Sequence, residues 1–434
     1  MKVMKWSVIA MAVAAGTSQM ALASSQSESE GFVEGSSLTI LNRNLYMNRD
    51  FRDNGNSPPE DDDGNLTGEN GQSYREEWGH GFIGTFESGF TQGTIGVGVD
   101  AIGLLGVKLD TGRDRNGNGL FPVGSDGRAA DDYSEAGAAI KLRASNTVLK
   151  YGTQLVALPV FSTDDARLLP ETAEGTIITS SEIEGLELNG GYFTALNAMA
   201  STDHDSSNGG ALENIAFAGG TYAISDALSA SLYYSDVEVI QTENDFEKFY
   251  GNLNYNMELG ADQSLAFDFN IYKTDVDAAD SDNTIWSLAS TYSFGAHGLT
   301  VAYQRSSGDA GYGYGLDGGG TVWLANSVQY SDFNGEDEKS WQARYDLNMA
   351  SYGVPGLSFM TRYISGDDIS TATGNGDERE WDVEAKYVVQ EGAAKDLSLR
   401  VRHAKYWSDS DYAPVNGTDL TDLRLIVEYP LNIL

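Results

Sequence analysis

The feature that most constrains this chain is an alternation of apolar and polar residues in segments about as long as a membrane-spanning strand. In segment 423–429 the odd positions are apolar, whereas Arg424 and Glu428 lie between them. The same alternation recurs in 265–271, 341–347, 357–363, 383–387 and 397–402. A period of two belongs to a β-strand with one apolar face, so the sequence predicts an all-β protein.

The connections between these segments indicate a membrane barrel. After residue 23 there is no apolar run long enough for a transmembrane helix. Short polar connections are expected at 225–227, 260–262, 295–297, 353–356 and 392–395. Between them, acidic and Gly-rich segments are expected to form long loops, at 275–282, 308–320 and 366–380. Short turns at one end and long loops at the other are typical of transmembrane antiparallel β-barrels.

Both ends of the chain fit this interpretation. Residues 1–23 have the features of a secretory signal, with Lys2 and Lys5 before an apolar stretch and Ala21–Ala23 as the cleavage site. The barrel domain is therefore expected to span 24–434. The last segment alternates up to a terminal Leu434, similar to the C-terminal signal of barrel proteins, although Phe is commoner there. We expect export to the outer membrane of a Gram-negative bacterium.

Composition excludes several classes of function. The chain has 27 Lys and Arg against 64 Asp and Glu, a net charge of -37, which repels nucleic acid. It has no Cys and only four His, none close to another in sequence, so thiolate, His-rich metal and Ser-His-acid sites are not expected. A calcium-like stretch at 114–119 lacks its final acid, because Ser125 stands there. No cofactor, metal or catalytic residue is predicted.

The alternation also predicts what lines the barrel. If the apolar positions face lipid, a set of cations faces the lumen: Arg344, Arg362, Lys386, Arg400, Arg402 and Arg424, with Lys141 and Arg143. A cation on the lipid face would cost about 2–4 kcal/mol at mid-bilayer. These cations could form a ladder of weak sites for a carboxylate. Alternatively, they could only balance inward acids, namely Asp346, Asp382, Glu384 and Glu428.

Several longer stretches resemble a known family. They are Glu77–Phe82, Glu87–Thr94, Asp131–Ser134, Arg167–Thr172, Ser181–Leu186, Leu324–Gly335 and Ser340–Gly356. Together they resemble the OprD (Occ) family of substrate-specific outer-membrane channels, over nearly all of the mature chain. The second half is most similar to the branch that takes up basic amino acids and related peptides, with carbapenems as adventitious cargo. The resemblance implies a monomeric barrel of about 18 strands, narrowed by loops folded into the lumen.

The resemblance also implies site residues. Its basic ladder corresponds to Arg49, Arg75, Lys386, Arg400, Arg402 and Arg424. Its constriction corresponds to Arg167, Ser327, Tyr330 and Asp332, with Tyr312 and Tyr314 nearby. Two departures affect substrate identity: Gly320 stands where relatives tend to carry a second acid, with Asp317 the nearest one, and the segment 54–73 is longer and more acidic than expected.

The sequence thus predicts a porin for passive uptake of basic amino acids and small zwitterionic peptides. Its expected partners are these small molecules and the lipid and lipopolysaccharide of the outer membrane. An organic-acid channel of the same family is the alternative. A barrel enzyme is disfavoured by the scarcity of His, and an adhesin would not need inward cations. For Asp332, the alternative role is to cap the turn before Asn334-Gly335.

Overall fold

A single sheet of 18 strands makes up the wall of the protein. The computed structural model describes residues 26–52, 73–112, 115–205, 212–240, 245–277, 281–417 and 419–434. The predicted signal at 1–23 and most of the acidic segment 54–73 lie outside these residues. Among the described residues, no helix has the length and apolar content needed to cross a membrane.

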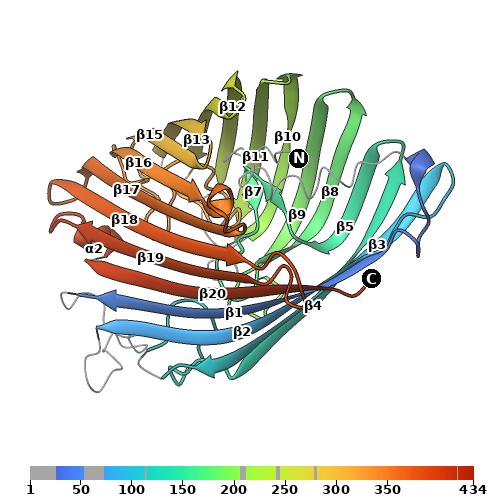
Figure 1. Cartoon of the computed structure of the whole chain (residues 1–434), viewed down its shortest axis with the longest axis horizontal. Helices are drawn as coiled ribbons and strands as arrows, with labels where there is room; N and C mark the ends of the chain where they lie inside the picture. Colours follow the sequence, from blue (N-terminus) through green and yellow to red (C-terminus); the bar gives the residue numbers. More distant parts are fainter. Residues whose placement is uncertain are drawn as a thin grey trace.

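The elements follow one another in simple order (Figure 1). The wall strands are β1 (Ser37–Phe51), β2 (Tyr74–Glu87), β3 (Ile95–Asp110), β4 (Asp132–Ala144), β5 (Thr147–Gln154), β8 (Thr172–Ile183), β9 (Leu186–Asn197), β10 (Leu212–Ser225), β11 (Leu228–Val239), β12 (Phe246–Gly260), β13 (Gln263–Val276), β14 (Ser281–Phe294), β15 (His297–Gly308), β16 (Lys339–Asn348), β17 (Leu357–Ser370), β18 (Asn375–Val388), β19 (Ser398–Ser408) and β20 (Leu420–Asn432). The short elements are η1 (Gln26–Glu28), β6 (Ala157–Leu158), β7 (Phe161–Ser162), η3 (Met349–Tyr352) and α2 (Ala413–Asn416).

The sheet closes on itself, which confirms the predicted antiparallel barrel. Each wall strand pairs with the next wall strand along the chain, and β1 also pairs with β20, from Thr39 opposite Asn432 to Phe51 opposite Leu420. Closure leaves no sheet edge within the membrane, where unpaired backbone groups would cost several kcal/mol each.

The connections differ between the two ends of the barrel. The predicted tight turns after β10, β12 and β14 are present, and the connections 349–356 and 389–397 are somewhat longer. At the opposite end, the connection 309–338 is long, as predicted. One predicted long loop is wrong, because β17 and β18 extend through most of 366–380. In the other, 275–282, β13 ends at Val276 and β14 begins at Ser281. Cross-strand pairing outweighs the weak strand preference of Asp and Gly there.

Side chains alternate between the two faces of the wall, as the sequence pattern predicts. In β15, Val301 is 64% exposed and faces outward, whereas its neighbour Ala302 is 2% exposed and faces inward. In β20, Leu425 is outward and Arg424 is buried inside the barrel. The apolar outer face is therefore available to lipid, and the inner face carries the polar groups.

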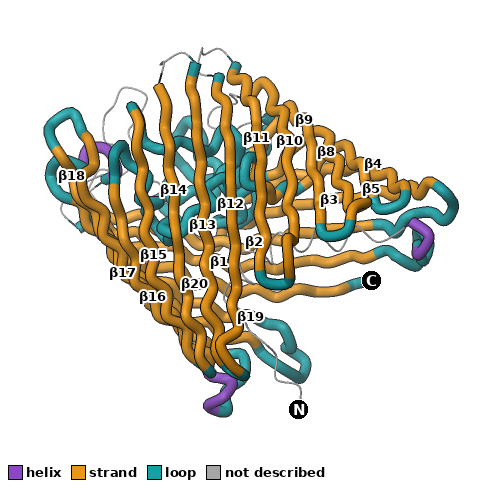
Figure 2. Tube along the Cα trace, turned by 90° about the horizontal axis from the view of Figure 1, so that it is seen from above, coloured by secondary structure: helices purple, strands orange, loops and turns teal. Residues whose placement is uncertain are grey.

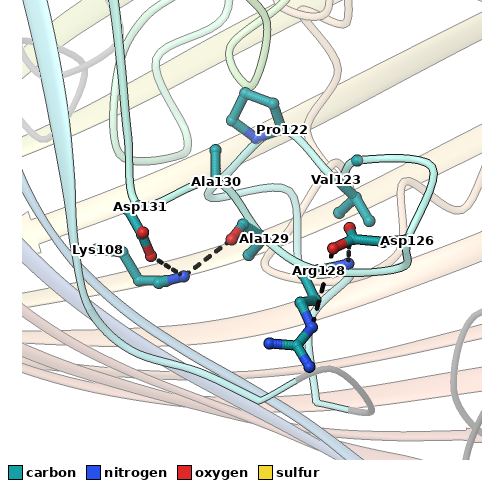
Figure 3. Close-up of a pocket in the computed structure, with 9 residues that line it drawn as sticks. Lys108, Pro122, Val123, Asp126, Arg128, Ala129, Ala130 and Asp131 are labelled. Carbon is teal, nitrogen blue, oxygen red and sulfur yellow. Dashed lines mark hydrogen bonds and ion pairs between the residues drawn. The ribbon is translucent and has the colours of Figure 1, made fainter.

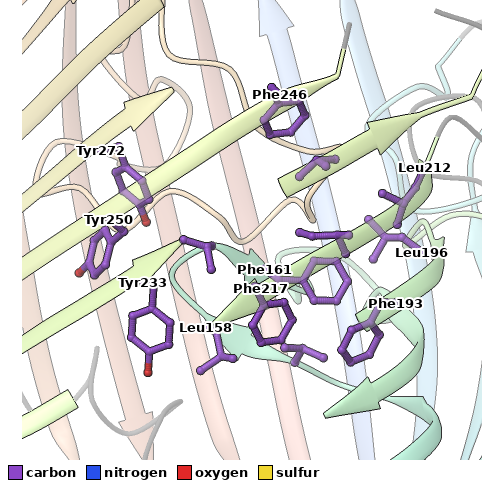
Figure 4. Packing of buried hydrophobic residues seen from close by; sticks show 14 of the residues in the cluster. Leu158, Phe161, Phe193, Leu196, Leu212, Phe217, Tyr233, Phe246, Tyr250 and Tyr272 are labelled. Carbon is purple, nitrogen blue, oxygen red and sulfur yellow. The ribbon is translucent and has the colours of Figure 1, made fainter. Parts of the chain in front are cut away.

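Two connections, 155–171 and 309–338, fill part of the barrel interior, and loops are seen inside the ring of strands in Figure 2. Segment 155–171, which joins β5 to β8, includes β6 and β7 and packs against the wall. The Phe161 ring lies 4.7 Å from the Phe193 ring of β9 and 6.0 Å from the Phe217 ring of β10 (Figure 4). Leu168 and Leu169 are also buried. The expectation that the segment around Arg167 lies inside the barrel is confirmed.

A charge on the outer face should weaken the barrel. Val301 lies four residues from the periplasmic end of β15, near the middle of the apolar band. Val301→Arg should lower the free energy of unfolding by about 2–4 kcal/mol, because the guanidinium would face hydrocarbon. Val301→Leu is the matched control and should change it little. Urea unfolding in lipid vesicles measures both, and equal midpoints for the two variants would contradict the assignment of this face.

Candidate functional site

The predicted ladder cations lie on five neighbouring strands of the wall, β2, β1, β20, β19 and β18. Near the end that carries the long loops, Arg75 of β2 is opposite Arg49 of β1, which is opposite Asp422 of β20. Two residues further along β20, Arg424 lies opposite Arg402 of β19. The strand register therefore places these cations on one continuous part of the inner wall.

The row continues toward the end with short turns. Arg400 lies two residues beyond Arg402 on β19, and it is opposite Lys386 near the end of β18. Residues two apart on one strand face are separated by about 6.6 Å. The six residues thus form a row that descends along the inner wall.

Inward acids accompany the ladder but do not balance it. Asp422 accepts ion pairs from both Arg49 (2.9 Å) and Arg424 (2.8 Å). Glu384 lies 2.6 Å from Arg400 and 3.5 Å from Arg402. Four positive charges therefore share two negative ones. Within the described part of the chain, Arg75 and Lys386 form no ion pair, which adds to the excess of positive charge.

Several of the other inward cations pair with acids. Arg344 lies 2.7 Å from Asp346, and Arg362 lies 2.6 Å from Asp382. Glu428 bonds to Arg43, and Lys141 lies 2.6 Å from Asp100. Arg143 donates to Gln26 in η1 and lies over the Phe90 ring. Lys150 shares Asp100 with Lys141. Arg344 and Arg362 each have one acid, which agrees with the alternative in which cations and acids balance.

Asp332 provides a negative group in the long inner connection 309–338. Its carboxylate accepts hydrogen bonds from the hydroxyl groups of Ser327 (2.5 Å) and Tyr314. No ion pair to Asp332 occurs among the described residues. Burial raises the pKa of Asp332, while the two hydroxyl groups oppose this shift. The carboxylate is therefore held by neutral donors and keeps its capacity to attract a cation.

Asp332 does not cap the turn that follows it. The backbone N–H of Gly335 donates to Glu338 at 2.8 Å, and the Asp332 side chain bonds to Ser327 and Tyr314 instead. The alternative role predicted for Asp332 is therefore wrong. Phe333 has a φ of 51°, so the backbone turns just after Asp332 without help from its side chain.

Arg167 lies between the ladder and the acidic group. Its guanidinium donates to the carbonyl oxygens of Asn118 (2.9 Å) and Ala166 (3.3 Å). Burial and the positive charges of Arg424 and Arg49 lower the pKa of Arg167 to about 10. Its charge also acts on Tyr314, together with those of Asp332 and Asp164. Charges of both signs thus meet where the two inner connections approach the wall.

The remaining predicted constriction residues differ in position. The Arg49 guanidinium lies over the Tyr330 ring, 4.9 Å from the ring centre. The Tyr330 hydroxyl donates to the carbonyl oxygen of Asn416. Tyr312 is buried, its ring centre lies 5.0 Å from that of Tyr272, and its hydroxyl donates to the Thr321 carbonyl oxygen. Tyr314 and Tyr330 are therefore near the charged groups, whereas Tyr312 belongs to the packing beneath them, because it faces the wall from the loop.

A buried ion pair that the sequence interpretation missed anchors the long inner connection. Lys248 of β12 bonds to Asp317, and neither side chain has any exposed surface. Asp317, considered from sequence as a nearby acid, is thus fully occupied and does not face the lumen. The alternation Glu247-Lys248-Phe249 could have placed Lys248 inside, since Phe249 is exposed outside.

Close backbone contacts join the two inner connections to each other. At Gly318, with a φ of 93°, an added Cβ would lie 2.0 Å from the carbonyl oxygen of Ser162. At Gly320 it would lie 2.6 Å from the Ser162 hydroxyl. The Glu171 carboxylate accepts from the backbone N–H groups of Gly319 (2.9 Å) and Asp164 (2.8 Å). Only glycine at 318 allows this approach.

A separate cavity of about 480 Å³ lies away from the ladder (Figure 3). It is lined by Lys108 and by residues 122–124, 126 and 128–131. Lys108 pairs with Asp131 at 2.6 Å, and Arg128 lies 3.9 Å from Asp126. Its charges are therefore matched within the cavity. Among the described residues no group of His, Cys, Asp and Glu could hold a metal ion.

Removing Lys248 should release the long inner connection. Lys248→Met would leave the Asp317 carboxylate buried without a partner, which costs about 3–5 kcal/mol. We expect faster proteolysis within 309–338 and a larger, noisier single-channel current. In the matched control, Lys248→Met with Asp317→Asn, the buried charge is gone and docking should largely recover. Identical behaviour of the single and double variants would show that the pair does not anchor the segment.

The sequence and the fold of the whole chain are similar to those of known proteins. The sequence model for "outer membrane porin, OprD family" matches residues 30–433. Porin D of Pseudomonas aeruginosa is 47% identical over the whole of both chains. The crystal structure of P. aeruginosa OprD is 44% identical with a TM-score of 0.76, covering 95% of this chain and 99% of that one. P. aeruginosa OpdK with vanillate is 33% identical with a TM-score of 0.79, covering 93% and 100%.

Proposed function

The chain belongs to the OprD family of outer-membrane porins, and we propose that within it the substrates are basic amino acids and small zwitterionic peptides. Members of the family are passive channels of the Gram-negative outer membrane, not enzymes. We further propose that the barrel acts as a monomer, because one chain supplies both the ladder and Asp332.

The observation that carries the substrate proposal is an Asp332 carboxylate without an ion pair, in a barrel whose inner wall has an excess of cations. Asp332 has two hydroxyl donors and no ion pair among the described residues. The adjacent wall has four arginines on two carboxylates. A molecule with a carboxylate and a guanidinium or ammonium group can satisfy both sides at once. A molecule with one charge can satisfy only one.

The ladder would guide the carboxylate in steps. Attraction between unit charges 4 Å apart is about 1 kcal/mol in water and about 4 kcal/mol at an effective dielectric of 20. Because Asp422 and Glu384 already occupy part of each arginine pair, the remaining attraction at each step is reduced. Several weak sites in series favour passage, whereas one strong site would trap the substrate.

A channel for organic acids is the second candidate. It is favoured by the excess positive charge along β18–β20 and by the vanillate, a carboxylate, in the relative OpdK. The two candidates differ in the importance of Asp332. An organic-acid channel needs the ladder alone, whereas a channel for basic amino acids needs the carboxylate as well.

Asp332→Asn separates the two candidates. It keeps the size of the side chain and its bond to Ser327 but removes the charge. Loss of a charge-assisted hydrogen bond of about 1–3 kcal/mol should lower the ratio of arginine to glutamate uptake roughly tenfold or more. Liposome swelling measures both rates. Asp337→Asn, an exposed charge removed from the same segment, is the control. An unchanged ratio in Asp332→Asn would favour the organic-acid channel.

Neutralising part of the ladder should slow substrates that carry a carboxylate. We combine Arg400→Gln and Arg402→Gln with Glu384→Gln, so that no buried acid is left without its partner. Uptake of arginine and of glutamate should both fall, by about tenfold if the lost attraction is about 1.4 kcal/mol. The control, Arg344→Gln with Asp346→Asn, removes a balanced inward pair. If both sets of substitutions have the same small effect, the ladder does not carry substrate.

A further inference from the structure

Four buried carboxyl groups form two pairs next to residues 330–335, the strip that carries Asp332. Glu338, at the end of the long inner connection, adjoins Glu378 of β18, and Glu380 adjoins Asp382 on the same strand. The exposed fraction of each residue is at most 1%. In each pair the two carboxyl groups lie within hydrogen-bonding reach of each other.

These carboxyl groups fasten the strip 330–335 to the wall. Glu380 accepts the backbone N–H groups of Tyr330 and Ser331, both at 2.9 Å. Glu378 accepts the Ser331 hydroxyl at 2.8 Å, and Glu338 accepts the N–H of Gly335 at 2.8 Å. Asp332 lies between these attachment points. Its position in the constriction therefore depends on acids that do not themselves contact the substrate.

The surroundings of Glu338 and Glu378 favour a proton between these two carboxyl groups. The oxygen Oε1 of Glu338 has no donor among the described residues. Two ionised carboxylates buried at this separation repel each other, so a proton between them is needed. Arg362, 2.6 Å from Asp382, is the cation paired with this group among the described residues. One guanidinium cannot balance the charge of four buried carboxylates. Arg362 neutralises part of the Glu380–Asp382 pair, whereas Glu338 and Glu378 have no such cation, so a proton is needed between these two.

Among the described residues, Glu338 and Glu378 form no ion pair, and their hydrogen-bond donors are neutral. Besides each other, Glu338 faces Asp367 of β17, and Glu378 bonds to Tyr406 of β19 and to Asn416. Tyr412, next to α2, is close enough to both glutamates and to Asp332 for their charges to act on its hydroxyl group. Burial and the charge of Glu378 raise the pKa of Glu338 well above its ordinary value.

We propose that Glu338 and Glu378 are positioning residues that share a proton, and that loss of this proton at higher pH releases the Asp332 strip and widens the constriction. A proton held more tightly in the docked state stabilises docking most fully below the ordinary glutamate pKa of about 4.5. This stabilisation declines as pH rises toward the docked pKa and is lost above it. The channel should therefore be narrowest in acid and wider in alkali.

Single-channel conductance of the full chain in KCl tests this proposal between about pH 4.5 and pH 9. We expect a reversible, several-fold rise in conductance with rising pH. Glu338→Gln should hold the low conductance throughout, because its amide N–H donates to Glu378 at every pH. Glu378→Gln should act in the same way. Glu336→Gln, the same change two residues away, should keep the rise.

Two other titrating groups near the inner connections serve as further controls. Burial raises the pKa of Glu171 to about 7, and Asp332 also titrates in the constriction. Glu171→Gln and Asp332→Asn should each keep the pH-dependent rise. If the rise persists in Glu338→Gln and Glu378→Gln, or is absent from the unaltered protein, the proposal is overturned. Heat-modified electrophoretic mobility confirms that each variant is folded.

The test does not depend on the substrate. The proposal extends the proposed function by adding control of the Asp332 strip, but KCl carries the measured current. Failure of the arginine preference in Asp332→Asn would leave the conductance rise intact. Conversely, a flat pH profile would leave the arginine preference untouched.

Discussion

The absence of water in the hydrocarbon layer governs the rest of this structure. Every backbone N–H and C=O at that depth needs a partner within the chain, and a sheet closed by β1 and β20 provides one. Once the sheet is closed, alternate side chains have only two destinations. Apolar residues such as Val301 face lipid, and residues such as Arg424 and Asp422 must face the lumen. Both signs of charge are thereby gathered inside one narrow space.

The same interior uses buried charge to position its loops. Lys248 with Asp317 fixes one connection. The buried Arg43 fixes the other by bonding to the half-exposed Asp165 and to the carbonyl oxygen of Arg167. These pairs need not add to net stability, because desolvation offsets much of their attraction. They do specify where a loop sits, since any other position leaves a charge without its partner. The charges exposed to substrate are held in place by charges that are not.

Alternation predicted the wall well because a strand offers only two orientations. Arg400 and Arg402 were placed in the lumen from the sequence alone, and the turn after β10 was located to within a residue. Residues in the inner loops follow no period, so Tyr312 was predicted in the constriction but packs against Tyr272. The long loop predicted at 366–380 was wrong because pairing extends β17 and β18 through acidic, Gly-rich sequence. Loop orientation depends on distant partners that spacing does not reveal.

The seam between β1 and β20 has a consequence for how the protein is made. Thr39 pairs with Asn432, so the first wall strand to be synthesised has its partner at the far end of the chain. Until β20 is available, β1 presents a row of unpaired backbone groups that could join another chain. A product interrupted before residue 420 would lack the closing strand entirely. The barrel can therefore close only once the chain has been made through β20.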